Sequence, residues 1–316
     1  MEKSIENELR KDSFLERWVI IARKRHARPQ DFSRNKKISP QTSPKACFFC
    51  PGNENLTPPE ITRLPKASKW RVRAFPNKFA AVSKDSKSAY GAHEVIVETP
   101  KHGERLSQIS SSHMLEVLEV FSARINSLAR DKRMKYVLLF KNEGKEAGAS
   151  LEHTHTQLIS LACIPSAVLE EISASSAYKA RRKKCPFCEL SNEKNERLIL
   201  ENKHASVLAP YASRFPFEMW VLPKKHTACL TKLKKEEKRA FAEALSRALK
   251  KLDKLLANPS YNLVFHISPL RSNSLHFHVE ICPRLSVWAG FEFGSGIIIN
   301  TMPPEEAAKA LRTQFE

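Results

Sequence analysis

The sequence predicts an α+β fold in which two similar halves each form an antiparallel sheet with helices packed against it. Three observations predict this fold. A pattern of cysteines and histidines occurs twice in the 316-residue chain, in the same order and at nearly the same spacing. Short alternating or continuous apolar stretches, typical of strands, surround each copy. Each half also contains one long segment with apolar residues at helical spacing, as expected of a helix that covers one face of a sheet.

The repeated pattern begins with a Cys-x-x-Cys pair, continues through a single histidine and ends in a His-x-His pair. The first copy comprises Cys47, Cys50, His102, His153 and His155, and the second comprises Cys185, Cys188, His226, His276 and His278. In both copies about fifty residues separate the single histidine from the His-x-His pair. The matching order and intervals indicate two related halves, with boundaries at 1–165 and 166–316.

The first half is expected to begin with a polar lead at 1–13. Short strands are then expected at residues 18–22, 71–74, 80–82 and 94–98. Apolar side chains from Met114 to Leu128 recur at helical spacing, which predicts a helix over 111–131 with a serine at its N-cap. A buried strand at 136–140 follows, and a loop rich in small residues leads from it to the His-x-His-x-Gln segment, which is also expected to be a strand.

The second half repeats this order after a connector at 165–184 that is rich in serine, alanine and lysine. Strands are expected at residues 218–222, 261–267 and 276–281. Between the first two of them, leucines and a phenylalanine at helical spacing predict a helix over 234–256.

Composition narrows the class of protein. The chain is 41% hydrophobic and 28% charged, as in ordinary soluble globular proteins, and no apolar stretch is long enough to span a bilayer. The polar N-terminus has no signal-peptide core, which predicts a cytoplasmic protein. A net charge of +19 predicts anionic partners, either phosphorylated metabolites or nucleic acid. With eight glycines and no Gly-x-Gly-x-x-Gly or Walker A motif, a Rossmann or P-loop site is not expected.

The cysteine pattern predicts two zinc sites. Four of the seven cysteines lie in Cys-x-x-Cys pairs, which in a reducing compartment favours metal binding over disulfides. Structural zinc takes four cysteine or histidine ligands in a tetrahedron. The expected ligands are Cys47, Cys50, His102 and His153 at one site, and Cys185, Cys188, His226 and His276 at the other.

The His-x-His-x-Gln segment carries the predicted chemistry. Alternate residues of a strand share one face, so His153, His155 and Gln157 are expected to lie side by side. With His153 on the metal, His155 keeps a free imidazole that can attack phosphorus, and the Gln157 amide can donate to a phosphoryl oxygen. The second copy has Glu280 where the first has Gln157. Because a carboxylate repels phosphate, the second half is expected to be structural.

This segment, His153-Thr154-His155-Thr156-Gln157, resembles the active-site motif of the histidine-triad superfamily, in its nucleotidyltransferase branch. Residues 15–312 as a whole resemble the galactose-1-phosphate uridylyltransferase family. The matching motifs include Arg-Lys-Arg-His-Ala-Arg-Pro at 23–29, the Cys-x-x-Cys knuckle at 47–53, and Phe-Pro-Asn-Lys-Phe at 75–79. The resemblance implies two tandem histidine-triad-like halves, of which 1–165 is catalytic and 166–316 has a degenerate site and a hexose-binding tail.

The same resemblance assigns roles to individual residues. His155 would be the nucleophile, assisted by Gln157. The implied nucleotide- and phosphate-binding residues are Arg25, Arg28, Asn77, Asn142, Ser150 and Gln157, and the implied hexose-binding residue is Glu292. The implied reaction is a ping-pong exchange of UMP between UDP-glucose and galactose-1-phosphate through a uridylyl-His155 intermediate. Family members act in galactose metabolism as zinc-containing dimers, with the hexose pocket completed by the partner chain.

Some features differ from the best-known members of that family. Thr154 stands where those enzymes have proline, and residues 294–299 contain no counterpart of their hexose-binding glutamine. The second metal site is of the Cys-x-x-Cys type. These features resemble the branch that includes ADP-glucose phosphorylase, so an ADP-sugar or dinucleoside-polyphosphate phosphorylase is the alternative enzyme. A zinc-dependent nucleic-acid-binding protein is the alternative of another class, and it predicts salt-sensitive binding that survives loss of His155.

Overall fold

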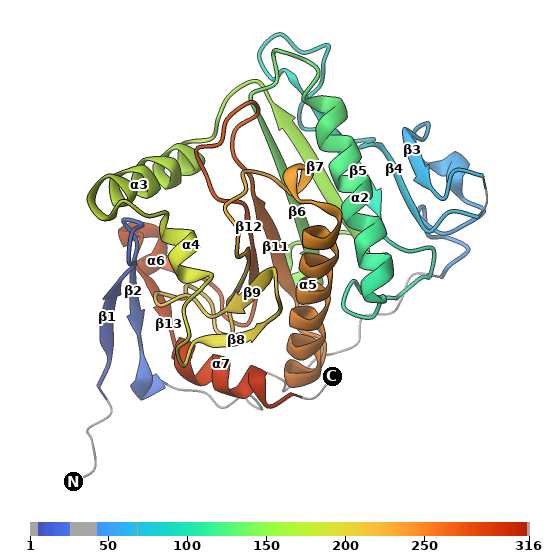
Figure 1. Cartoon of the computed structure of the whole chain (residues 1–316). Helices are drawn as coiled ribbons and strands as arrows, with labels where there is room; N and C mark the ends of the chain where they lie inside the picture. The colour runs from blue at the N-terminus through green and yellow to red at the C-terminus, as the bar shows by residue number, and fades with distance from the viewer. Residues whose placement is uncertain (1–5, 26–42, 68, 315–316) are drawn as a thin grey trace.

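The structure is a computed structural model that describes residues 6–25, 43–67 and 69–314. Strands of these residues form a ten-stranded sheet and a separate three-stranded sheet, and helices pack against them (Figure 1). The predicted α+β class is confirmed. No helix in the described ranges is both long and apolar enough to cross a lipid bilayer.

The large sheet runs without a break through both halves of the chain. From one edge to the other its strands are β3 (Thr62–Leu64), β4 (Val72–Pro76), β5 (Gly91–Val97), β7 (His155–Leu161), β6 (Tyr136–Glu143), β11 (Tyr261–His266), β12 (His278–Pro283), β10 (Met219–Pro223), β9 (Ala205–Leu208) and β8 (Leu198–Glu201). All neighbours pair antiparallel. The order is mirrored about the β6–β11 junction, so β5 corresponds to β10 and β7 to β12. The sequence repeat is therefore also a repeat of strand positions.

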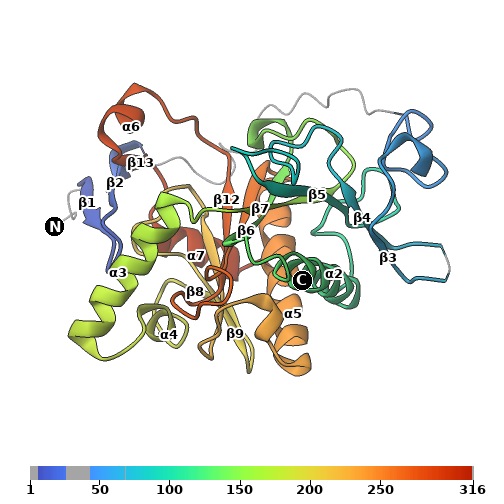
Figure 2. The same ribbon diagram turned by 90° about the horizontal axis from the view of Figure 1, so that it is seen from above.

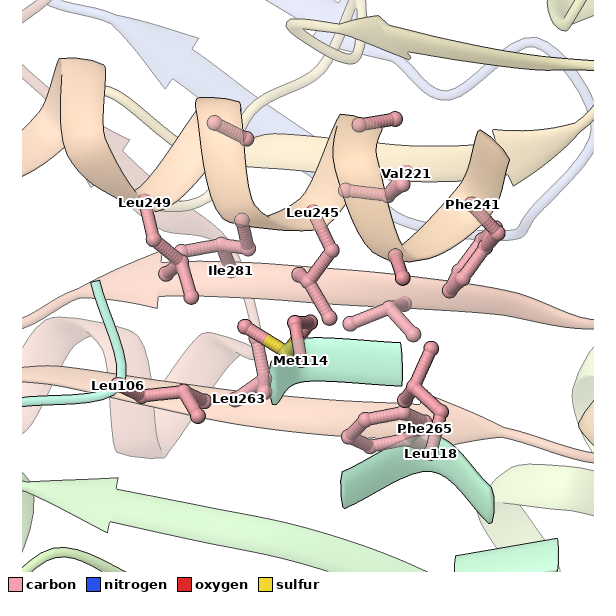
Figure 3. Packing of buried hydrophobic residues seen from close by; sticks show 14 of the residues in the cluster. Leu106, Met114, Leu118, Val221, Phe241, Leu245, Leu249, Leu263, Phe265 and Ile281 are labelled. Carbon is pink, nitrogen blue, oxygen red and sulfur yellow. The ribbon is translucent and has the colours of Figure 1, made fainter. Parts of the chain in front are cut away.

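Two long helices cover the middle of this sheet and form the core with it. They are α2 (Ser111–Leu128) and α5 (Lys235–Leu256), and they also pack against each other. Figure 3 shows Met114 and Leu118 of α2 facing Leu245 of α5 across side chains of β11. Ser110 accepts a hydrogen bond from the His113 backbone N–H and is the N-cap that the sequence predicts. Since α2 and α5 come from different halves, burial of their apolar faces holds the halves together.

The remaining helical elements are shorter than α2 and α5. They are α3 (Ser166–Arg182), α4 (Pro186–Leu190), α6 (Gly290–Ser295), α7 (Pro304–Arg312) and the 3₁₀ helices η1 (Arg23–Arg25), η2 (Glu54–Leu56), η3 (Lys145–Ala147) and η4 (Leu230–Lys232). The small sheet joins β1 (Glu8–Lys11), β2 (Trp18–Ile21) and β13 (Ile298–Asn300). It lies beside α3 and α6, on the side of the molecule away from β3 and β4 (Figure 2).

Several local predictions were wrong. Part of the expected lead at 1–13 is strand β1, because Arg10 anchors it to Glu305 of α7 by an ion pair. Residues 80–82 form no strand, because the Ala81 N–H donates to the His93 side chain instead of to a neighbouring strand. Strands β8 and β9 were missed by the sequence reading. The connector at 165–184, whose composition is compatible with a helix, is largely helix α3.

Candidate active site

The four predicted ligands of the first half converge at one end of β7. Their ligand atoms all lie within 4.8 Å of one another. The Cys47 Sγ and Cys50 Sγ atoms each lie 3.5 Å from His153 Nδ1, and Cys50 Sγ lies 3.3 Å from His102 Nδ1. His153 Nε2 lies 2.8 Å from the Thr99 carbonyl oxygen and can donate to it. That bond leaves Nδ1, the nitrogen that faces the two thiols, free to bind a metal ion.

The second half contains the same arrangement. The ligand atoms of Cys185, Cys188, His226 and His276 also lie within 4.8 Å of one another. His276 Nδ1 is 3.4 Å from Cys188 Sγ, and His276 Nε2 is 3.0 Å from the Pro223 carbonyl oxygen. Both groups thus contain two thiols and two imidazoles, and in each the first histidine of the His-x-His pair is oriented by a backbone carbonyl. Either group could hold a metal ion.

His155 opens strand β7, next to the first cluster, and its ring is held in one tautomer. Its Nδ1 atom lies 2.9 Å from the His153 carbonyl oxygen, which can only accept, so Nδ1 carries the proton and Nε2 keeps its lone pair. The side chain is buried and packs edge-on against Phe49. Burial lowers the pKa of His155, and the positive charge of Lys141 lowers it further. Both effects favour the neutral imidazole, in which Nε2 has a free lone pair.

The side chain of Gln157 is oriented by a residue that the sequence reading missed. The Ala81 N–H donates to His93 Nδ1, so the proton of the neutral ring is on Nε2, which lies 2.8 Å from Gln157 Oε1. This bond leaves the amide hydrogens of Gln157 available for another acceptor. Asn77 Nδ2 lies 3.1 Å from the same His93 nitrogen, so the structure brings the predicted residues Asn77 and Gln157 together. Burial lowers the pKa of His93 and favours its neutral form.

A signal for His93 was present in the repeat. His93-Glu94 in the first half corresponds to Phe217-Glu218 in the second. At this position the first half, which contains Gln157, has a polar residue, whereas the second half has phenylalanine.

Asn142 receives its support from the other half of the chain. It lies opposite Asn262 in the register between β6 and β11. Asn262 Nδ2 donates to Asn142 Oδ1 and to the Ala147 carbonyl oxygen, both at 2.9 Å. The first bond fixes the amide orientation of Asn142 and leaves its nitrogen free to donate, and the second holds the loop before Ser150. The role of Asn262 depends on the pairing of β6 with β11, so its neighbours in the sequence do not indicate it.

The other predicted binding residues make no side-chain hydrogen bond with this group within the part of the chain that the structure describes. Arg25 is exposed in η1, Ser150 is exposed after the Gly144–Ala149 loop, and Arg28 lies outside the described residues. Glu292 accepts a hydrogen bond from the Ala289 N–H and thereby caps α6. Because α6 packs on β13, Glu292 lies with the small sheet, away from β5.

In the second half His278 has the same ring geometry as His155 but different neighbours. His278 Nδ1 lies 3.0 Å from the His276 carbonyl oxygen, as His155 does from His153. Glu171 of α3 lies 3.5 Å from His278 Nε2, and the Glu280 carboxylate is paired with Arg214. Phe187 stacks on the His278 ring. Since buried carboxylates lie beside His278, a phosphate group there would be repelled. The ligand atoms of Glu171, His266 and His278 form a further group within 4.8 Å.

Comparison with known proteins gives a consistent result along the chain. The model of the galactose-1-phosphate uridyl transferase N-terminal domain matches residues 1–165, and that of the C-terminal domain matches residues 171–287. ADP-glucose phosphorylase of Arabidopsis thaliana is 33% identical, over 98% of this chain and 94% of that protein. Galactose-1-phosphate uridylyltransferase of Thermotoga maritima is 31% identical, over 96% of this chain and 98% of that protein.

Solved structures agree with these matches. An ADP-glucose phosphorylase from Arabidopsis thaliana with bound ADP-glucose superposes with a TM-score of 0.87 at 32% identity, covering 98% of this chain and 99% of that chain. A uridylyltransferase mutant superposes with a TM-score of 0.77 at 27% identity, covering 97% of both chains.

Proposed function

This chain belongs to the galactose-1-phosphate uridyl transferase family, and we propose that it transfers a nucleoside monophosphate from a sugar nucleotide to a phosphate acceptor through His155. The observation that carries this proposal is the state of the His155 ring. It is buried, and its Nδ1 proton is held by the His153 carbonyl oxygen, so Nε2 is the nitrogen that is left to react.

The proposed reaction has two displacements at the same phosphorus. In the first, His155 Nε2 forms a bond to the α-phosphorus while the bond to the leaving sugar-phosphate oxygen breaks. In the second, an oxygen of the acceptor phosphate attacks, and the imidazole leaves as the neutral ring. Gln157 would donate its amide hydrogens to a non-bridging oxygen as negative charge builds there. Asn142, whose amide nitrogen is free, is suited to donate to the nucleotide.

We assign zinc to both Cys₂His₂ groups, because their donors and spacing fit tetrahedral coordination. Such an ion supplies a rigid cross-link in each half. In the first half it would fix His153, whose carbonyl oxygen orients the nucleophile. The residues holding it would be Cys47, Cys50, His102 and His153, and the ion would take no part in bond making.

Two donors are supported by separate observations. UDP-glucose, with galactose-1-phosphate as acceptor, is supported by the family matches over both halves and by the Thermotoga maritima relative. ADP-glucose, with inorganic phosphate as acceptor, is supported by the Arabidopsis thaliana relative and its higher TM-score. The absence of a hexose-binding glutamine from residues 294–299 also favours the second pair.

Intact-protein mass spectrometry under non-acidic conditions distinguishes the donors, because such conditions preserve a phosphoramidate. The protein is incubated separately with UDP-glucose and with ADP-glucose. A uridylyl adduct identifies the first donor and an adenylyl adduct the second. If neither adduct forms, nucleotidyl transfer from these donors is excluded and the nucleic-acid-binding alternative, motivated by the charge of +19, is tested next.

Replacing His93 by phenylalanine, the residue of the second half, is expected to slow adduct formation about 10²-fold, because Gln157 then loses the bond that orients its amide. Rapid-quench measurement of the adduct gives the rate. His113→Phe, which removes a histidine of α2 outside this group, is the matched control. Equal rates for the His93 variant and the wild type would show that Gln157 needs no such orientation.

We also propose that the protein is a homodimer in which Glu292 serves the hexose site of the partner. The segment around α6 exposes apolar side chains that a partner chain could cover, with Val287 89% and Phe293 76% exposed. Its position with the small sheet is compatible with a role in another subunit.

A further inference from the structure

A buried charged network lies behind the strand that carries the nucleophile. Thr154 and Thr156 alternate with His153, His155 and Gln157, so their side chains point to the opposite face of the sheet. There they meet Glu98, which follows β5, and Lys141 of β6. The side chains of Lys141 and Glu98 are fully buried. The network therefore spans three adjacent strands directly beneath the active-site segment.

Every hydrogen of the Lys141 ammonium has an acceptor. Its Nζ atom lies 2.7 Å from Glu98 Oε2, 2.6 Å from Thr154 Oγ1 and 3.0 Å from the His155 carbonyl oxygen. Thr154 in turn donates to Glu98 Oε2 at 2.7 Å, and Thr156 donates to Glu98 Oε1. The network thus binds the backbone of the nucleophile itself, as well as the side chains on both sides of it.

Lys141 lies where strands β6 and β7 stop pairing with each other. The register between β6 and β7 ends at the pair Phe140–Gln157, whereas β6 continues to Glu143 in register with β11. On the other side β5 stays paired with β7 as far as His155. Beside His155 the β6 ladder is therefore missing, and the Lys141 side chain supplies a donor to the His155 carbonyl oxygen on that side.

The energetics argue that this pair serves more than stability. Burying two charges has a desolvation cost that their attraction often fails to offset, and a buried ion pair replaced by apolar residues of similar size commonly leaves a protein equally stable or more so. The contacts of this network converge on residues 154–156, so the network can instead fix the positions of these residues. A nucleophile must be held within fractions of an ångström of its reactive position.

We propose that Lys141 and Glu98, acting through Thr154 and Thr156, are positioning residues that hold the His155 backbone for attack at phosphorus. In this segment the hydrogen-bonded ion pair is what restricts the backbone. The proposal rests on the proposed function for its catalytic part, and its structural part can be measured without substrate.

The experiment compares Lys141→Met with the double variant Lys141→Met/Glu98→Leu. The single variant leaves Glu98 buried without its cation, so its Tm is expected to fall. Glu143, which lies 3.2 Å from Lys141 Nζ, keeps its second cation, Arg105, at 3.4 Å in both variants. The double variant should therefore recover the wild-type Tm to within a few degrees. Despite that recovery, the double variant is expected to form the nucleotidyl adduct at least about tenfold more slowly, with KM for the sugar nucleotide within about twofold of the wild type. Arg10→Met, which breaks the ion pair between the buried Arg10 of β1 and Glu305 of α7, is the control that loses stability but keeps the rate.

Hydrogen exchange of the peptide covering residues 153–157 supplies the substrate-free readout. We expect faster exchange of this peptide in the double variant at unchanged Tm, and this result would support the positioning role. Failure of every sugar nucleotide to label the wild-type protein would refute the proposed function, but it would leave the exchange result valid. Wild-type exchange and a wild-type rate together would overturn the proposal. Should the double variant fail to fold, Thr154→Val/Thr156→Val removes the hydroxyl contacts with little change of shape, and the same two measurements decide.

Discussion

His155→Ala is expected to abolish nucleotidyl transfer while the protein stays folded. Loss of a covalent nucleophile costs on the order of 10⁴- to 10⁶-fold in kcat, or roughly 5 to 8 kcal/mol of barrier. Fold stability should change far less, because the His155 side chain belongs to neither Cys₂His₂ group and its main bond is to a local carbonyl. The measurements are the intact mass after incubation with each sugar nucleotide, the steady-state rate, and Tm.

The chain supplies its own matched control for this variant. His278 is the counterpart of His155 in the second half, with the same bond from Nδ1 to the carbonyl of the preceding histidine. His278→Ala should keep the adduct and most of the rate. Full transfer activity in the His155 variant would refute the assignment of His155 as the nucleophile. Loss of the adduct only in the His278 variant would place the nucleophile in the second half.

The architecture could largely be predicted because it follows from periodicity. The α2 and α5 stripes and the strands β6, β7, β11 and β12 are long or strongly apolar, and the structure places them within a few residues of the predicted bounds. Strand β1 could not be predicted in this way, because ion pairs from Arg10 hold a polar strand in place. Nor does a periodic pattern reveal that β6 and β11 join the two halves into one sheet, since that depends on which edges meet.

Some residues of the candidate site could likewise be predicted from the sequence, and others could not. Residues close in sequence, such as His153, His155 and Gln157, could be grouped from alternation alone, and the metal groups could be assembled from the repeat. Residues that act through distant contacts could not. The roles of His93 and Asn262 follow from the hydrogen bonds they make to Gln157 and Asn142 across strand pairs. Lys141 looks like an ordinary lysine in a strand until its complete burial is seen.

Loss of the first metal group is expected to lower both stability and catalysis. Cys47→Ser removes one thiolate, so the proposed zinc ion, which would cross-link the 47–50 turn to His102 and His153, should be released. Structural zinc contributes on the order of 10 kcal/mol in small peptides. In a domain with its own large core, a net loss of a few kcal/mol, and so a Tm lower by roughly 10 °C, is the expected result. Metal content by elemental analysis and Tm by calorimetry provide the check.

A variant of the second metal group distinguishes the effect on stability from the effect on the catalytic rate. Cys185→Ser should lower Tm in the same way, but it should leave the rate of adduct formation nearly unchanged, since His276 orients His278 and not the nucleophile. In the first half, by contrast, His153 is both a proposed zinc ligand and the residue whose carbonyl oxygen accepts the His155 proton, so freeing its ring should also disturb the proposed nucleophile. Equal losses of rate in the two variants, at equal losses of Tm, would mean that the metals act only through global stability. A loss of rate confined to Cys47→Ser would tie catalysis to the carbonyl oxygen of His153.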